Sequence, residues 1–361
     1  MMRRAKPGFI VTLLIGSVLL AVASLFIGTE SPSVSQAFRD WMDGKGVYES
    51  AHLSVFVQQR LPRTLLALIA GGGLALTGCA FQALLRNPLA TPYTLGIASF
   101  GALGAWTATI VIQYATMLLS GADRGFAGDV ILWLVQADVL GFSLVQFFAF
   151  LFAGVDVLLI YIIATQRTHI SPSVLLLAGV TLGMLANAGI MLMRFLAHPT
   201  LLVNMERWLM GGVDLPGYEP VVALIVGVLP CSVILILQAS KFDQLGFGAE
   251  MAAGRGVNVK RLQVVTFLFG SLLTAIIVSK VGPIGFAGLI VPHAVRSVTG
   301  SRHRLLMPLC VIAGGGFLCF CDILARKLLT GETPIGIVTA LFGGPFFLYL
   351  LVRGRFTDWD T

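Results

Sequence analysis

Residues 241–263 read KFDQLGFGAEMAAGRGVNVKRLQ and form one of the few charge-bearing runs in this chain. The whole chain is 57% hydrophobic and 11% charged, whereas soluble domains carry roughly 25% charged residues. The run holds many small residues and too little apolar surface to bury a core of its own. We expect two short helical turns, at 243–253 and 257–262, broken by Gly254 and Gly256, which permit a bend. The run is therefore either a solvated loop or an element that docks onto a partner.

Ten apolar segments make up most of the remaining chain. A helix that crosses a bilayer needs ~20 predominantly apolar residues. The predicted spans are residues 9–27, 64–85, 93–119, 139–164, 172–197, 219–239, 262–280, 284–298, 305–329 and 334–352. Their apolar runs are continuous and do not alternate with polar residues, which argues against a transmembrane β-barrel. We therefore expect an all-α polytopic membrane protein that forms a single domain over residues 1–361.

Lysine and arginine residues indicate how these spans are oriented. Cytoplasmic loops carry an excess of both residues. The run 241–263 and the turns near residues 86 and 302 are basic. The segments at the opposite ends of the spans carry acidic residues as well as basic ones. We therefore place both termini and the run 241–263 in the cytoplasm. A cleaved signal peptide is the alternative for residues 9–27, but their apolar run is closer in length to a full span.

The composition also excludes several functions. The net charge of +7 comes from basic residues scattered between apolar segments, so it does not indicate nucleic-acid binding. The five cysteines lie inside apolar runs without the spacing of a metal site, so we expect no metal and no other cofactor. The chain has no G-x-x-x-x-G-K-[ST] motif and is not expected to hydrolyse ATP itself.

Arginines mark the outer ends of two predicted spans. Arg60 and Arg63 belong to the sequence RLPR before the second span, and Arg326 follows Asp322 by four residues in the ninth. A spacing of four places Asp322 and Arg326 on one face of a helix. Arginines at a span end either extend to lipid headgroups or bind a partner, and the residues alone leave both interpretations open.

Polar side chains within the spans are further candidates. Met184, Asn187 and Met191 recur at spacings of three and four, so they share one face of the fifth span, and Arg194 follows near its outer end. Methionine adapts its shape to bulky ligands, so this face suits a solute pathway, with plain helix packing as the other interpretation. Asp156 lies within the fourth span, where an ionisable residue is either functional or hydrogen-bonded inside the bundle.

Six stretches together resemble a known family. They are RLPR at 60–63, RNPLATPYTLGIASFGALGA at 86–105, GFGAEMAAGRGVNV at 246–259, VGPIGFAGLIVPHAVR at 281–296, DILAR at 322–326 and ETPIGIVTALFGGPFF at 332–347. The chain resembles the permease subunits of bacterial ABC importers for iron–siderophore complexes, haem and vitamin B12, the FecCD-type family. The resemblance covers nearly the whole chain from about residue 60.

The resemblance implies a ten-helix subunit in the bacterial inner membrane. Helices 2–5 and 7–10 form related halves of opposite orientation, as in many transporters. The implied partners are a second permease subunit, identical or different, two cytoplasmic ATP-binding subunits, a periplasmic substrate-binding protein and membrane lipid.

The resemblance also implies roles for individual residues. The run 241–263 corresponds to coupling helices that dock on the ATPase, and Arg60, Arg63 and Arg326 to positions that pair with acidic residues of the binding protein. The fifth helix lines the central pathway. The expected coupling residues are Gly246, Glu250, Ala253, Gly254, Arg255 and Gly256.

The expected function is permease-mediated import of a ferric siderophore. Haem and vitamin B12 are alternative cargos within the family, because the pathway residues do not identify the cargo. A secondary transporter is the alternative from another class, and it requires an ion site midway through the membrane. Asp156 and Asp322 are the acidic residues within the predicted spans, and Asp322 has Arg326 as a ready partner.

Overall fold

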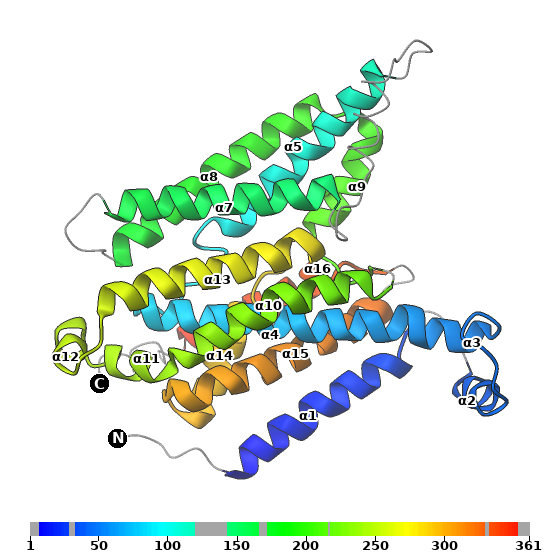
Figure 1. The fold of residues 1–361 in the computed structure, drawn as a ribbon, viewed down its shortest axis with the longest axis horizontal. Coiled ribbons are helices and arrows are strands. Elements are labelled where there is room, and N and C mark those ends of the chain that lie inside the picture. The colour runs from blue at the N-terminus through cyan, green and yellow to red at the C-terminus, as the bar shows by residue number, and fades with distance from the viewer. Residues whose placement is uncertain are drawn as a thin grey trace.

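A computed structural model describes residues 7–28, 33–119, 143–165, 172–215, 217–328 and 332–352. These ranges contain helices and no strand (Figure 1). Eight helices are long and apolar enough to cross a membrane. They are α1 (Pro7–Phe26), the continuous helix of α3 (Ala51–Ser54), η1 (Val55–Arg60) and α4 (Leu61–Leu85), then α5 (Ile97–Leu118), α7 (Leu144–Thr165), α8 (Pro172–Leu196), α10 (Glu219–Leu237), α13 (Val259–Val281) and α15 (His303–Lys327).

Two shorter helices occupy the other predicted spans. They are α14 (Ala287–Thr299) and α16 (Ile335–Val352). Thirteen residues of α14 extend only about 20 Å, so α14 alone does not cross a hydrocarbon core of ~30 Å. The all-α membrane fold is therefore confirmed, while the count of ten spans stays a prediction. The predicted start of the fourth span, 139–142, lies outside the described residues.

Helix α4 is the centre of the bundle. It lies among α10, α13, α14 and α15 (Figure 1), and 83% of the apolar window in this helix is buried. Glycines let its backbone approach its neighbours. A Cβ on Gly71 would overlap the carbonyl oxygen of Gly314 in α15, and a Cβ on Gly78 would overlap that of Gly288 in α14. Small residues at such crossings are typical of membrane helices.

The connecting helices lie at opposite ends of the bundle. Figure 1 shows α11 (Ala239–Leu245) and α12 (Ala249–Gly254) at one end, and α2 (Val34–Met42) and α3 at the other. Another short helix, α9 (Pro199–Leu209), directly follows α8. Helix α1 is peripheral and packs mainly on α15, and only 6% of its apolar window is buried.

Candidate functional site

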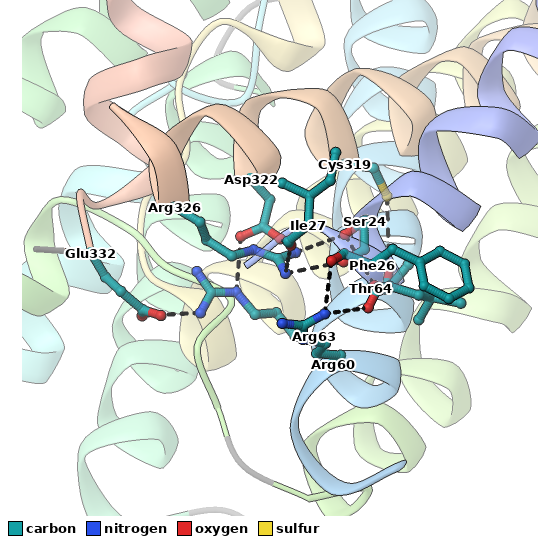
Figure 2. Close-up of polar contacts among 11 residues, drawn as sticks. Ser24, Phe26, Ile27, Arg60, Arg63, Thr64, Cys319, Asp322, Arg326 and Glu332 are labelled. Atoms are coloured by element: carbon teal, nitrogen blue, oxygen red, sulfur yellow. Dashed lines mark hydrogen bonds and ion pairs between the residues drawn. The ribbon is translucent and has the colours of Figure 1, made fainter. Parts of the chain in front are cut away.

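A cluster of charged side chains from the start of α4, the end of α15 and the segment before α16 contains the three predicted docking arginines (Figure 2). We call Arg60, Arg63, Asp322, Arg326 and Glu332 the arginine cluster. Asp322 is 0% exposed and lies between two guanidinium groups. Its Oδ1 accepts a hydrogen bond from Arg63 Nε at 2.9 Å, and its Oδ2 accepts one from Arg326. Charge-assisted bonds of this kind offset the cost of burying a carboxylate.

Two of the arginines bind the C-terminal end of α1. Arg60 Nη1 donates to the carbonyl oxygens of Leu25 at 2.9 Å and Phe26 at 3.0 Å. Arg326 Nη1 donates to the carbonyl oxygen of Ile27 at 2.8 Å and to another in the last turn of α1. Because the last carbonyls of a helix lack partners within it, and α1 has no basic residue in its own last turn, these guanidinium groups cap α1 and match its dipole.

Arg63 has a different environment from the other two. Its Nη1 donates to Glu332 Oε2 at 3.0 Å, and its side chain is 12% exposed. It lines a cavity of about 220 Å³, together with charged groups from α9, from the segment after α9, from α13 and from the segment before α16. The charged lining residues are Arg63, Arg207, Asp214, Lys280 and Glu332. Arg63 thus faces an open space, whereas Arg60 and Arg326 are 5% and 4% exposed.

The predicted coupling run breaks where we expected it and at one further place. Helix α12 ends at Gly254, and Gly256, with φ +84°, turns the chain towards α13. The break that we did not expect lies between Leu245 and Ala249, around Gly248, whose φ is +111°. The expected helical turn at 257–262 is wrong as a separate element, because Asn258 caps α13, which begins at Val259.

The six predicted coupling residues are all exposed. Two apolar side chains that the sequence analysis missed lie among them: Phe247 is 49% exposed and Met251 is 53% exposed. Arg255 lies over the Phe247 ring at 5.1 Å from its centroid, a cation–π contact. The sequence signal for Phe247 and Met251 is their apolar side chains, spaced by four in a polar run.

Asp243 of the coupling run is hydrogen-bonded to His303 at the start of α15. Asp243 Oδ1 accepts hydrogen bonds from the backbone N–H of His303 at 2.6 Å and from its ring Nδ1 at 3.0 Å. Burial would raise the pKa of Asp243, but the hydrogen bonds from His303 outweigh burial and hold that pKa below its usual value. In α12, the buried side chain of Ala252 packs against the core of the bundle.

The predicted pathway residues lie on an open face of α8. Met184 is 68% exposed and Met191 is 67% exposed, with Asn187 also exposed between them. We call these three residues the α8 stripe. Arg194 forms an ion pair with Glu206 of α9. The described residues of this chain therefore leave the stripe exposed. Lipid, a second subunit or a solute pathway would lie against it.

Asp156 of α7 is buried next to the start of α5. It is 0% exposed, and neither carboxylate oxygen has a hydrogen-bond partner among the described residues. Both oxygens lie within 3.3 Å of the position that a Cβ on Gly96 would take, and Gly96 precedes α5. The Asp156 side chain therefore lies at the N-terminal end of α5.

Comparison with known proteins identifies the family. The FecCD transport family matches residues 13–353. The chain belongs to the FecCD transport family. Its relatives include the cobalamin import permease BtuC of Halobacterium salinarum, 37% identical over 85% of this chain and 75% of that one. The ferric enterobactin permease FepD of Escherichia coli is 30% identical over 97% of this chain and 95% of that one.

A solved structure supports the same assignment. It is an inward-facing conformation of a putative metal-chelate type ABC transporter, with a TM-score of 0.79 and 29% identity over 96% of this chain and 100% of that one. The resemblance noted from the motifs is therefore confirmed. As a FecCD family member, the chain is a multi-pass permease subunit of an ABC transporter and not an enzyme.

Proposed function

We propose that this FecCD protein imports a ferric siderophore from the periplasm to the cytoplasm of a bacterium. Two findings support an importer of this type: the ferric enterobactin relative covers nearly the whole chain, and the exposed coupling residues and the cavity beside Arg63 lie at opposite ends of the bundle (Figure 1). Vitamin B12 is the second candidate cargo, because the relative at 37% identity is a cobalamin permease. Haem is a third cargo within the resemblance.

The proposed topology has ten spans and both termini in the cytoplasm. Helix α14 completes its span with the irregular segment 282–286, which packs inside protein as membrane-depth backbone must. The related inverted halves are then α4, α5, α7 and α8, and α13 to α16. Lysine and arginine favour the cytoplasmic side, and this places α11 and α12 inside the cell and α2 and α3 outside.

Segment 241–263 couples the permease to two ATP-binding subunits. Its exposed face combines the apolar Phe247 and Met251 with Glu250 and Arg255, a mixture typical of subunit interfaces. One observation carries this assignment: α12 is anchored to the core by Ala252 alone, while its remaining side chains are exposed. An ATPase groove would cover them.

Docking of the binding protein centres on Arg63. Arg60 and Arg326 already bind the end of α1, so their part in docking is to hold the site. Arg63 lines the cavity and pairs with the partly exposed Glu332. A carboxylate of the incoming binding protein would take the place of Glu332. A guanidinium group can form the same bidentate pair with either carboxylate.

The cargo would pass between two copies of the chain. The α8 stripe of each copy would face the other across the pathway, which gives a homodimer an uncharged, methionine-lined surface. An ion-coupled secondary transporter needs a membrane-depth ion site. Asp322 is neutralised by Arg63 and Arg326, which disfavours it as such a site.

Transport by the reconstituted complex tests this proposal. The permease, its ATP-binding subunits and binding protein are placed in proteoliposomes, and uptake of a ferric siderophore, hemin and cobalamin is compared. We expect ATP-dependent uptake of the siderophore and none with a non-hydrolysable ATP analogue. If only cobalamin or hemin were taken up, that compound would replace the siderophore as the proposed cargo. Uptake driven by an ion gradient without ATP would overturn the proposal of an ATP-driven importer.

A further inference from the structure

Helix α2 has an apolar face that is not buried in the protein. Its apolar residues are Val34, Ala37, Phe38, Trp41 and Met42, which share one arc of the helix because they recur at spacings of three and four. Only Ala37 is buried. The other four side chains are between 49% and 67% exposed, and the Phe38 and Trp41 rings lie 6.0 Å apart.

One edge of α2, where Ala37 of the apolar arc lies next to the polar Asp40, attaches the helix to the protein. Asp40 Oδ2 accepts a hydrogen bond from Ser50 Oγ at 2.6 Å, and Oδ1 accepts one from Lys45 Nζ at 2.6 Å. Ser50 in turn caps α3 by accepting a hydrogen bond from Leu53 N. In a helix on a soluble protein the apolar face contacts the core and the polar face contacts water. In α2 only Ala37 of the apolar face is buried, so the rest of that face needs a different cover.

The chain before α2 keeps it close to the end of a lipid-facing helix. Val18, Leu19 and Phe26 of α1 are 50–62% exposed. Gly28 lies against the guanidinium group of Arg60, and Ser33 caps α2. Five residues span at most about 18 Å, so α2 starts near the level at which α1 leaves the hydrocarbon core. Phe26 at the end of α1 and, apart from Ala37, the apolar arc of α2 are both exposed.

We propose that α2 is an interfacial helix, and that Val34, Phe38, Trp41 and Met42 insert among the lipid headgroups and upper acyl chains of the outer leaflet. Tryptophan concentrates at the membrane–water interface, where its ring sits at headgroup level. Amphipathic helices with Trp, Phe and Leu on the apolar face and charges opposite lie in this plane. The apolar arc of α2 carries no charge, whereas the proposed docking site for the binding protein is built from arginine, so lipid fits this face better than that protein does.

This anchorage would position the docking site. Asp40 connects α2 to Ser50 and so to α3, which continues through η1 into α4. The π-helical turn of η1 ends at Arg60, three residues before Arg63. A membrane-bound α2 would therefore hold the outer end of α4, with its docking arginines, at a fixed height above the bilayer.

Two cysteine variants of the full-length permease test the proposal in vesicles of phosphatidylethanolamine and phosphatidylglycerol. Phe38→Cys labels the apolar arc, and Gln36→Cys is the matched control, because Gln36 is exposed on the opposite face of the same helix. The five native cysteines are buried. Each new thiol carries an environment-sensitive fluorophore. Its quenching by aqueous iodide and by lipids with a nitroxide on the upper acyl chain is then measured.

We expect the label at 38 to emit at shorter wavelength, to be quenched by the nitroxide lipid, and to be several-fold less sensitive to iodide than the label at 36. Trp41→Cys should repeat the result for 38. Equal iodide quenching at 36, 38 and 41 would overturn the proposal. Shielding at 38 and 41 that arises only after the binding protein is added would overturn it too, and would assign the face to that protein. Thermal unfolding of each variant confirms that it is folded.

Discussion

Replacing Arg63 by glutamine should weaken docking with only a moderate loss of stability. Arg63 makes two charge-assisted hydrogen bonds, to Asp322 and Glu332. Such a bond contributes about 1.5–3 kcal/mol. The bond to Glu332 counts for less, because Glu332 is 31% exposed and water can replace the lost partner. Asp322 also keeps Arg326, so we expect a total loss of about 1.5–3 kcal/mol.

Arg326→Gln is the matched comparison, and it should cost more. It removes the i,i+4 partner of the buried Asp322 and three hydrogen bonds to the end of α1. Breaking a buried ion pair by removing one member costs about 3–5 kcal/mol. Arg326→Gln should therefore unfold at a lower temperature than Arg63→Gln, and it should loosen α1.

Two assays separate the effects. Thermal unfolding of the purified permease gives the order of stabilities, and association of the binding protein with the permease in nanodiscs is followed at several salt concentrations. We expect Arg63→Gln to slow association and to reduce its salt dependence, because charges at the edge of an interface mainly govern encounter. Glu332→Gln should speed association, since it removes the internal carboxylate that competes for Arg63.

The reasoning would be refuted by two results. One is an unchanged association rate for Arg63→Glu at low salt, where electrostatic steering is strongest. The other is a larger loss of stability for Arg63→Gln than for Arg326→Gln. A change of an acidic residue to a basic one on the binding protein that restores docking of Arg63→Glu would support the pairing directly.

Three further predictions follow from other parts of the chain. Gly78→Val should destabilise the permease by more than ~1–3 kcal/mol, because its side chain would collide with the carbonyl of Gly288, whereas Gly154→Val, with no atom near its Cβ, should unfold at close to the wild-type temperature. Cysteines at the α8 stripe should react with water-soluble thiol reagents in at least one nucleotide state, and protection in every state would make the stripe plain packing. The lowered pKa of Asp243 means that its pairing with His303 stabilises the fold above the usual pKa of 3.8 and is lost as the pH falls through the lower folded-state pKa. The difference in unfolding temperature between wild type and Asp243→Asn should therefore be present at pH 6 and vanish in acid, and a difference that does not change with pH would contradict it.

Continuous apolar runs predicted the long helices well, because a helix inside a membrane contacts lipid or other helices, and not water, over most of its length. The segment 305–329 became α15, which spans His303–Lys327, and 64–85 became α4. In the run 241–263 the break at Gly254 and Gly256 was predicted, but the break at Gly248 was missed. The run holds four glycines, and because any of them permits a positive φ, the sequence does not show that Gly248 adopts one as well as Gly256.

The internal partners of the arginine cluster could not be predicted. Arg60 and Arg326 bind backbone carbonyls of α1 that lie far away in sequence, and every residue has a carbonyl, so no residue type marks the acceptor. Glu332 precedes α16 in an irregular segment, where no periodicity indicates which side chain it meets. The pairing of Asp322 with Arg326 was local, and the i,i+4 spacing indicated it.

The most direct test of an ATP-driven importer is the ATPase activity of the complete complex in proteoliposomes, with Gly254→Trp compared with wild type. Gly254 is exposed and helical and has no atom near its Cβ, so tryptophan should leave the permease folded and should block only what docks on α12. We expect binding protein loaded with ferric siderophore to stimulate ATP hydrolysis by the wild-type complex, and expect the Gly254→Trp complex to lose both stimulation and uptake. Normal stimulated hydrolysis and uptake with Gly254→Trp would contradict the account.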